Sequence, residues 1–291
     1  AVPTLDALHL AGHTIVGVVT QPDRRRGRGK QLVASPVKQR AMELNCPVFT
    51  PERIKRDLDS QQQLAGLGAD LSVVVAFGQI LPASVLDQPP LGCWNGHGSL
   101  LPRWRGAAPI QWSILEGDPE TGVGVMAMEE GLDTGPVLLE RRLSIGLLEN
   151  AVQLGERLSA LTAELMVESM PRIEAAGPGP VSERLNRLNV RVQSEDISYA
   201  RMLTKADFIL DWSQSALNIH RKVMGLYPGV ITHWEGKRLK ITETEPLIER
   251  LSNQLSLEAK ALVGRWPTGG TPGGVVLDQI PDLGVVVSSS G

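Results

Sequence analysis

The sequence is poor in the residues on which several protein classes depend. It contains two cysteines, Cys46 and Cys93, among 291 residues. Two cysteines so far apart exclude a disulfide-rich scaffold and a zinc site of the Cys-x-x-Cys type, and they fit a reducing compartment. No apolar run reaches the roughly 20 residues of a membrane-spanning helix. Aromatic residues make up 4% of the chain, so the core must consist mainly of aliphatic side chains.

Neither sign of charge is in large excess. The chain has 29 Lys and Arg against 32 Asp and Glu, for a net charge of −3 at pH 7. A nucleic-acid partner would therefore have to bind a local basic patch rather than the protein as a whole. Hydrophobic residues make up 42% of the 291 residues, which is enough for two domains that each bury a core.

Three common ligand motifs are incomplete. The stretch GRGKQ resembles a phosphate loop, but no Gly precedes it at the required distance and Gln31 replaces the Ser or Thr. His9 and His13 have the spacing of metal ligands on a helix, but Gly12 interrupts that helix and no third ligand is near. No G-x-G-x-x-G follows an expected strand. We therefore predict neither a nicotinamide cofactor nor a metal.

Short apolar runs alternate with helical patterns over the first 176 residues. The patterns predict helices at 1–12, 36–45, 107–118 and 152–175, and strands at 13–23, 46–51, 69–82, 92–98, 121–131 and 135–145. This alternation is typical of an α/β domain with an open, mostly parallel sheet. In such sheets ligands bind beyond the carboxyl ends of the strands.

The character of the chain changes near Gly177. Residues 177–200 are rich in Pro, Gly and polar side chains, which indicates a linker. One helix at 213–227 and short strands at 230–236, 237–246, 273–279 and 283–290 follow it. We therefore predict three parts: a catalytic domain at 1–176, the linker at 177–200 and a small β-barrel domain at 201–291.

An Asn and a His stand two residues apart where one of these strands ends. On an extended strand the side chains of Asn95 and His97 point to the same face, so both can donate to one oxygen that becomes negative. Asp133, in a Gly-bounded loop after the next strand, is the best candidate to orient the His. Glu129 and Glu130 are less suited, because adjacent acids at a strand end are usually solvated. Capping of the strand end and an Asx-turn are the structural alternatives.

A basic loop follows the first expected strand. It contains five cations within seven residues, namely Arg24, Arg25, Arg26, Arg28 and Lys30. Such a run is often only a solvated surface, but the glycines within it also suit contact with phosphates. The residues alone leave both interpretations open. Lys38 and Arg40 extend the basic character into the next helix.

Several long motifs together resemble the folate-dependent formyltransferases. They are NGHGSLLPRWRGAAPIQ, MEEGLDTG, TQPDRRRGRGKQLVASPVK, VVVAFGQILP and ARMLTKADFILDWSQSALNIHRKVMGLYPG, and the match is best with the branch that acts on methionyl-tRNA. The resemblance implies a Rossmann-like domain followed by an OB-like barrel. It also implies transfer of a formyl group from 10-formyltetrahydrofolate to the α-amino group of methionine on initiator tRNA, in translation initiation.

The resemblance carries residue roles onto this chain. It implies that Asn95, His97 and Asp133 are catalytic, with Asn95 and His97 donating to the developing oxyanion and Asp133 holding His97. The tetrahydrofolate contacts that it implies are Ser99, Leu100, Leu101, Pro102, Phe77, Gln79, Ile80 and Leu81. The tRNA contacts are Arg24, Arg25, Arg26, Arg28 and Lys30, together with the C-terminal domain. No metal is needed for this reaction.

The family contains alternatives that the motifs do not all exclude. A relative could formylate glycinamide ribonucleotide or an amino sugar nucleotide, or could hydrolyse formyltetrahydrofolate, and a folate- or RNA-binding module without activity is a further class. The basic loop and the second domain favour the tRNA enzyme. We expect a monomer with no membrane association in a bacterial-type cytoplasm, with an organellar stroma or matrix left open.

The chain departs from the family pattern in three places. Gly96 replaces the branched apolar residue usual between the Asn and the His, which is expected to loosen that strand. The family's first strand and the end of its last domain have no counterpart, which indicates a chain truncated at both ends. We expect the strand at 14–20 and the strand of Asn95 and His97 to flank the resulting gap. The catalytic strand should then loosen first, and the chain should express poorly and have little activity.

Overall fold

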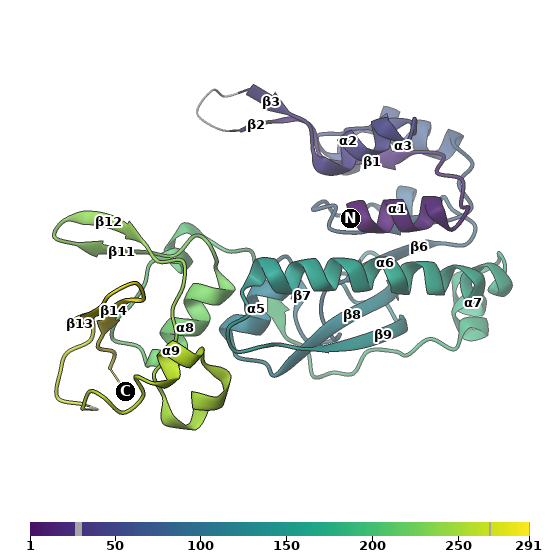
Figure 1. Cartoon of the computed structure of the whole chain (residues 1–291). Helices are drawn as coiled ribbons and strands as arrows, with labels where there is room; N and C mark the ends of the chain where they lie inside the picture. The colour runs from purple at the N-terminus through teal and green to yellow at the C-terminus, as the bar shows by residue number, and fades with distance from the viewer. Residues whose placement is uncertain (27–30, 268, 291) are drawn as a thin grey trace. The chain divides into compact units, whose positions relative to one another are not determined.

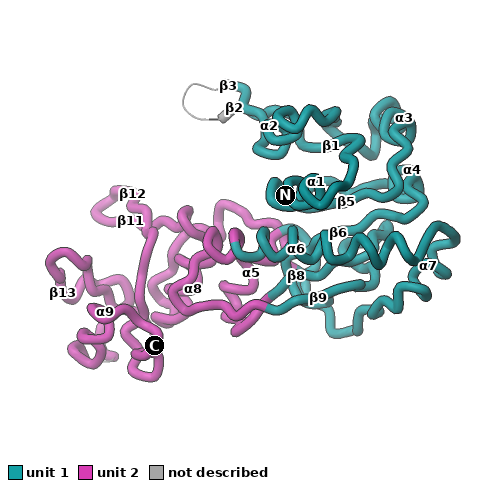
Figure 2. The backbone as a smooth tube through the Cα atoms, turned by 45° about the vertical axis from the view of Figure 1, so that its right-hand side comes forward, with its two compact units in different colours: residues 1–107, 122–142, 157–199 teal, residues 108–121, 143–156, 200–291 magenta. Residues whose placement is uncertain are grey.

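The computed structural model describes residues 1–26, 31–267 and 269–290. They form two compact units, drawn in different colours in Figure 2. The first unit contains residues 1–107, 122–142 and 157–199, and the second contains residues 108–121, 143–156 and 200–291. Asn95, His97 and Asp133 all belong to the first unit. Within the described residues, no helix is both long and apolar enough to cross a membrane.

The first unit alternates short strands with helices (Figure 1). Its helical elements are α1 (Val2–Leu10), α2 (Pro36–Glu43), η1 (Ile54–Arg56), α3 (Leu58–Gly66), α4 (Ala83–Leu86) and α7 (Val181–Leu188). Its strands are β1 (Val18–Val19), β2 (Arg24–Arg26), β3 (Gln31–Val33), β4 (Val48–Phe49), β5 (Ser72–Val74), β6 (Cys93–His97) and β7 (Arg105–Gly106). Four elements have residues in both units: α6 (Ala151–Ala176), β8 (Glu120–Ala127), β9 (Val137–Ser144) and β10 (Tyr199–Ala200).

The helices expected near the start of the chain are confirmed. α2 begins as its sequence predicts, because the Ser35 hydroxyl accepts from the backbone N–H of Lys38 and Pro36 follows it. α1 and α2 enclose a small core of Leu5, Val18 and Ala41. α7 was not expected, and it lies within the segment interpreted as a linker.

In the described part of this unit, two separate pairs of strands are parallel. β1 pairs with β4, and β5 pairs with β6, which places Val74 opposite Asn95. β8 runs antiparallel to β6, and β9 completes a sheet in the order β5-β6-β8-β9. The sheet is therefore mixed rather than mostly parallel, which corrects the expectation from sequence. The α/β class itself is confirmed.

The strand that bears Asn95 and His97 is internal. β6 has β5 on one side and β8 on the other, and in the described sheet β5 and β9 are the edge strands. The expectation that the catalytic strand borders a gap is therefore wrong, whereas the expectation that this strand loosens first stays a prediction. Buried residues of α6 in the first unit, among them Leu158, Leu165 and Met166, contribute to the core of this unit.

The second unit combines short helices and hairpins. Its elements are α5 (Pro109–Leu115), η2 (Lys205–Phe208), α8 (Ala216–Gly225), β11 (Ile231–Trp234), β12 (Lys237–Lys240), η3 (Glu249–Gln254), α9 (Leu257–Lys260), β13 (Val276–Ile280) and β14 (Gly284–Val287). Gly225 lets α8 pack closely on α5, since a Cβ there would lie 3.2 Å from the carbonyl oxygen of Gln111. β11 pairs with β12 and β13 pairs with β14, both antiparallel. The described strands of this unit form these separate hairpins and no closed barrel.

Candidate active site

The structure brings Asn95, His97 and Asp133 together. β6 is extended, so Asn95 and His97 lie on one face of it, as their spacing predicts. Asn95 Nδ2 donates to Asp133 Oδ1 over 3.4 Å, and His97 Nδ1 lies 3.7 Å from Asp133 Oδ2. The His97 side chain is 6% exposed and that of Asp133 is 14% exposed. An amide, an imidazole and a carboxylate therefore meet in a mostly buried position.

Asp133 is held in an unusual backbone conformation. Its φ of 53° lies in the left-handed region, where Asp is better tolerated than most residues but still unfavourable. The turn is tight, because a Cβ on Gly135 would lie closer than 3.0 Å to the carbonyl oxygen of Ala127. The backbone N–H of Gly106 donates to Asp133 Oδ2 over 2.8 Å. The Asp133 carboxylate is therefore held by a backbone N–H of β7 as well as by the Asn95 amide of β6.

The second ring nitrogen of His97 is occupied. His97 Nε2 lies 2.9 Å from the carbonyl oxygen of Trp104. Because a carbonyl oxygen can only accept, this nitrogen must carry a hydrogen. Nδ1 is then the nitrogen free to exchange a proton, and it is the one that faces Asp133. Trp104 has a φ of 63°, and its own N–H donates to the hydroxyl of Ser198 over 3.0 Å.

Gly96 is tightly packed between the two candidate catalytic residues. It lies opposite Val125 of β8. A Cβ on Gly96 would lie closer than 3.0 Å to Thr162 Cγ2 and 3.6 Å from Met166 Cε and Val75 Cγ2. The close approach of α6 therefore explains the glycine by lack of space, a reason different from the loosened strand that the sequence led us to expect.

The residues that the family resemblance assigns to folate divide into two groups. Leu101 packs with Met126 and Val137 in the core, Leu81 is buried, and Ser99 is buried with its hydroxyl donating to the carbonyl of Arg103 over 2.6 Å. The remaining side chains are less enclosed, and they are Leu100, Pro102, Phe77, Gln79 and Ile80.

Gln79 and Ile80 illustrate this second group. Ile80 is 67% exposed, so it offers apolar surface to a ligand. The side chain of Gln79 instead spans to the chain before α3, where it accepts from the N–H of Ile54 at 2.8 Å and donates to the carbonyl of Pro51 at 3.0 Å. The Gln79 side chain therefore links the segment after β5 to the chain before α3.

The basic loop forms a hairpin of β2 and β3. Arg24 and Arg25 are exposed, and Arg24 donates to Gln21 over 3.2 Å. Arg26 belongs to β2, and the predicted contacts Arg28 and Lys30 lie outside the described residues. The basic character does not extend freely into α2, because Lys38 pairs with Asp23 at 2.9 Å and Arg40 pairs with Asp6 and Glu43.

Two residues at the site escaped the sequence analysis. Arg105 is 5% exposed, and its Nε and Nη2 donate to Gln193 Oε1 over 3.0 and 2.8 Å. Gln193 Nε2 in turn donates to the carbonyls of Asp133 and Gly135, over 2.9 and 2.7 Å. Arg105 is part of the motif NGHGSLLPRWRGAAPIQ, but we assigned it no role. Nothing in the polar stretch around Gln193 indicated that Gln193 belongs to a site.

Other chemistry near β6 is disfavoured by burial. Cys93 is 3% exposed, and burial raises the pKa of its thiol to about 11, so it stays protonated and a poor nucleophile at neutral pH. Glu129 and Glu130 are exposed, as expected of solvated acids. Among the described residues, no group of three or more His, Cys, Asp or Glu side chains is arranged to hold a metal ion.

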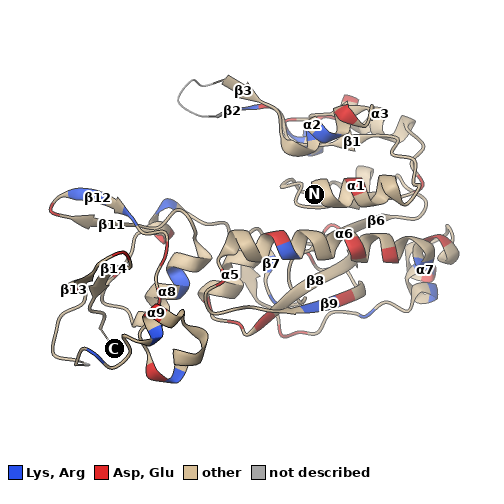
Figure 3. Ribbon diagram, in the orientation of Figure 1, with Lys and Arg blue, Asp and Glu red and all other residues tan. Residues whose placement is uncertain are grey.

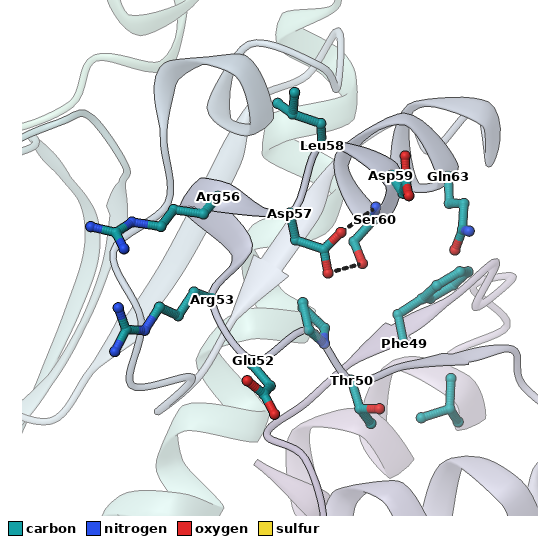
Figure 4. Close-up of a pocket in the computed structure, with 12 residues that line it drawn as sticks. Phe49, Thr50, Glu52, Arg53, Arg56, Asp57, Leu58, Asp59, Ser60 and Gln63 are labelled. Carbon is teal, nitrogen blue, oxygen red and sulfur yellow. Dashed lines mark hydrogen bonds between the residues drawn. The ribbon is translucent and has the colours of Figure 1, made fainter.

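A cavity of about 830 Å³ lies elsewhere in the first unit, lined by residues of β4, η1 and α3 (Figure 4). Asp57 caps α3 there, accepting from the N–H and the hydroxyl of Ser60 over 2.9 and 2.8 Å, and these bonds hold the pKa of its carboxyl below the usual range. Arg53 and Arg56 share the cavity with three carboxylates, those of Glu52, Asp57 and Asp59. Among the predicted site residues that the structure describes, none lines this cavity, so the candidate site is defined by the polar cluster of Asn95, His97 and Asp133.

Comparison with known families decides the class of protein. The family model described as "Formyl transferase" matches residues 1–170, and the model described as "Formyl transferase, C-terminal domain" matches residues 202–290. The chain belongs to the formyltransferase family. Asn95, His97 and Asp133 of this formyltransferase all fall within the first of the two matched regions.

Sequence relatives of this formyltransferase are highly similar over its whole length. The methionyl-tRNA formyltransferase of Parasynechococcus marenigrum (strain WH8102) is 76% identical over 291 residues, which cover 100% of this chain and 86% of the relative. The methionyl-tRNA formyltransferase of Synechococcus sp. (strain CC9605) is 74% identical over the same shares of the two chains.

Solved structures resemble this formyltransferase at low sequence identity. A 4-N formyltransferase from Francisella tularensis has a TM-score of 0.62 at 17% identity, covering 83% of this chain and 93% of its own. HypX from Aquifex aeolicus, in complex with tetrahydrofolic acid, has a TM-score of 0.53 at 19% identity, covering 68% and 33%. At such identities the likeness concerns the fold.

Proposed function

We infer that this formyltransferase moves the formyl group of 10-formyltetrahydrofolate to the α-amino group of methionine on initiator tRNA, in translation initiation. The observation that carries this conclusion is 76% identity to a methionyl-tRNA formyltransferase over the full length of the chain. A formylated amino sugar nucleotide or formylated glycinamide ribonucleotide is not favoured as the product, and the neighbours whose titles name a sugar substrate share only 16–18% identity with the chain.

We assign the chemistry to the cluster on β6. The amine nitrogen bonds to the formyl carbon, the bond from that carbon to the folate nitrogen breaks, and one proton passes from the amine to the folate. Asn95 has a second amide hydrogen beyond the one that it directs at Asp133, and this hydrogen is available to the carbonyl oxygen as it becomes negative.

His97 and Asp133 handle the proton in this assignment. The family resemblance implies that His97 donates to the oxyanion, but here Nε2 is held by Trp104. We therefore assign the proton transfer to Nδ1, which accepts the proton of the amine and returns it to the leaving nitrogen. The carboxylate of Asp133 lies 3.7 Å from Nδ1 and stabilises the imidazolium that exists between the two proton transfers. The Gly106 N–H keeps that carboxylate in place.

We propose that folate lies against the segments around Phe77–Leu81 and Ser99–Pro102. The exposed Ile80 and the half-buried Phe77 and Leu100 suit an apolar ring system. Ser99, Leu81 and Leu101 are buried and Gln79 bonds to the chain before α3, so these four support the proposed folate-binding surface from beneath. A contact of folate with their side chains would require these segments to rearrange.

We propose two surfaces for tRNA. The first is the β2–β3 hairpin, with Arg24 and Arg25 exposed as phosphate contacts and with Arg26, Arg28 and Lys30 assigned by family resemblance. The second is the β11–β12 hairpin, where β12 exposes three cations in four residues (Figure 3) and Trp234 is 47% exposed. Cations beside an exposed aromatic ring suit a nucleic acid backbone and an unstacked base.

The division into a catalytic domain at 1–176, a linker at 177–200 and a tRNA-binding domain at 201–291 stays a prediction, as do the OB-like barrel, the monomeric state and the cytoplasmic location. The direct test of function is to incubate the purified chain with 10-formyltetrahydrofolate and either methionyl-tRNA or water alone. Formyl-methionyl-tRNA is the expected product. Folate turnover that is independent of tRNA would identify a hydrolase instead, and absence of both would refute the assignment.

A further inference from the structure

The segment after α7 is attached to the site at several points. The backbone N–H and carbonyl of Arg191 bond with those of Val137 at 2.8 and 2.9 Å. Farther along, the N–H of Arg105 donates to the carbonyl of Ser198 over 3.0 Å, and the Ser198 hydroxyl accepts from Trp104. Between these two attachments stands Gln193, in a stretch whose composition indicated a linker. This stretch is therefore a wall of the site.

The amide of Gln193 uses all of its hydrogen-bonding capacity. Its two N–H hydrogens go to the carbonyls of Asp133 and Gly135, at 2.9 and 2.7 Å. Its oxygen accepts twice from Arg105, at 3.0 and 2.8 Å. The orientation of this amide is unambiguous, because the reverse would set its NH₂ against the guanidinium and its oxygen against two carbonyls.

The charge of Arg105 reinforces this orientation. Its side chain is 5% exposed, and buried Arg side chains are rare unless a partner compensates them. Both described hydrogen bonds of its guanidinium go to the neutral oxygen of Gln193. Hydrogen bonds from a cation are stronger than neutral ones, so Arg105 fixes the Gln193 amide firmly.

Gln193 bonds to the loop of Asp133 and Gly135, whose backbone is strained. Asp133 has a left-handed backbone with a φ of 53°, a conformation that persists only where its surroundings impose it. Gln193 bonds the carbonyl of Asp133 itself and that of Gly135, two residues on, and so spans the turn. The Gly106 N–H, which holds the carboxylate, follows directly after Arg105 in β7.

We propose that Gln193 is a positioning residue for the formyl transfer. It couples Arg105 to the Asp133 turn and thereby directs the Asp133 carboxylate at Asn95 and His97. The described hydrogen bonds of the Gln193 side chain go to Arg105 and to the backbone of the turn, so Gln193 acts on the catalytic side chains through that backbone. This inference rests on the role proposed above for Asp133.

Three substitutions separate positioning from simple stability. Gln193→Glu keeps the size and gives Arg105 a carboxylate, but it loses both donors to the turn. Gln193→Ala loses both functions, and Ser194→Ala is a matched control at an exposed neighbour. We expect kcat for methionyl-tRNA formylation to fall about 10- to 100-fold in both Gln193 variants, as for a displaced catalytic group. KM for each substrate should change less than about threefold, and the control should match the parent protein.

The pH profile and a double variant complete the test. If Gln193 acts through Asp133, then Gln193→Ala should distort the pH profile of kcat as Asp133→Asn does, and the Asp133→Ala/Gln193→Ala double variant should be no slower than Asp133→Ala alone. Full activity of Gln193→Glu, or additive losses in the double variant, would overturn the inference. If thermal melting shows that Gln193→Ala is unfolded, the Gln193→Glu variant replaces it in each comparison, because its carboxylate still pairs with Arg105.

The same set of proteins tells apart the failure of this inference from the failure of the assigned function. A parent protein without formylation activity would remove the assigned function. An active Asp133→Ala protein would remove the role of Asp133. Loss of activity in Asp133→Ala with full activity in both Gln193 variants would refute the positioning role alone.

Discussion

Replacing Gly96 with alanine should destabilise the protein although alanine is the smallest possible addition. The φ of Gly96 is not in the left-handed region, so its backbone conformation suits alanine. At such a position the change usually stabilises by about 0.4–1 kcal/mol, because it restricts the unfolded chain. Here the new Cβ would lie closer than 3.0 Å to Thr162 Cγ2, and β6 cannot recede easily because strands pair on both of its sides.

Thr162 cannot turn away without loss. Its hydroxyl donates to the carbonyl of Leu158 over 2.7 Å, and the side chain is buried. Rotation of the methyl would break this bond and leave a buried hydroxyl unpaired, which costs about 1–3 kcal/mol. Displacing α6 instead is overpacking, at about 1–3 kcal/mol. The restriction of the unfolded chain offsets part of this cost. The net free energy of unfolding of Gly96→Ala should therefore fall by about 1–2 kcal/mol, which corresponds to a fall in Tm of about 2–8 °C.

Thr162→Ser provides the matched rescue, because serine keeps the hydroxyl and lacks only the methyl. Calorimetry on the parent, both single variants and the Gly96→Ala/Thr162→Ser double variant forms a complete cycle. We expect the alanine to cost little or nothing in the serine background, a coupling of about 1–2 kcal/mol. A Gly96→Ala protein that melts at or above the parent, or a double variant without rescue, would refute the packing argument.

The remaining predictions concern chemistry, tRNA and pH. His97→Ala should lower kcat about 10²–10⁴-fold and Asn95→Ala about 10²–10³-fold with folate binding retained, as measured by single-turnover formylation and folate titration; near-parental turnover would remove either residue from the mechanism. Changing Arg24 and Arg25 together to Ala should raise KM for methionyl-tRNA and flatten its salt dependence while folate affinity stays the same, and an unchanged salt slope would reduce the hairpin to solvated surface. Because burial raises the pKa of the Cys93 thiol from 9.0 to about 11, the folded protein keeps a proton that the unfolded chain releases, so stability on the order of 2–3 kcal/mol should be lost as pH rises from about 9 to 11. Denaturation of Cys93→Ala should lack this part of the pH slope and substitution of the other cysteine should retain it; equal slopes in all three proteins would contradict the assignment.

Local rules predicted the parts of the site that depend on one strand or one helix end. The two-residue period of a strand is sufficient to put Asn95 and His97 on one face, and the Ser35-Pro36 start of α2 follows from capping alone. The sequence did not reveal which strands are neighbours. The apolar run of β8 reads the same in either direction, so neither its antiparallel course nor the internal place of β6 could be deduced.

Long-range partners account for what the sequence analysis missed. Gln193 is polar and stands among polar residues, and its partners Asp133 and Arg105 are 60 and 88 positions away. Lys38 and Arg40 seemed to enlarge the basic loop, but Asp23 and Asp6 neutralise them from 15 and 34 positions away. Contacts of this kind depend on the folded topology, and no local pattern in composition or spacing records them.

The short ladder between β1 and β4 implies that the free energy of local unfolding differs between parts of the first unit. Two residue pairs join β1 to β4, over a small core of Leu5, Val18 and Ala41, whereas four pairs join β6 to β8. Amide hydrogens of the short ladder should therefore exchange with solvent through local openings of lower free energy than those of β6. The β2–β3 hairpin extends from the chain between β1 and β4, while Asn95 and His97 stand on the longer ladder. Mild heat or denaturant should thus weaken the proposed binding of phosphates by the β2–β3 hairpin before it disturbs Asn95 and His97.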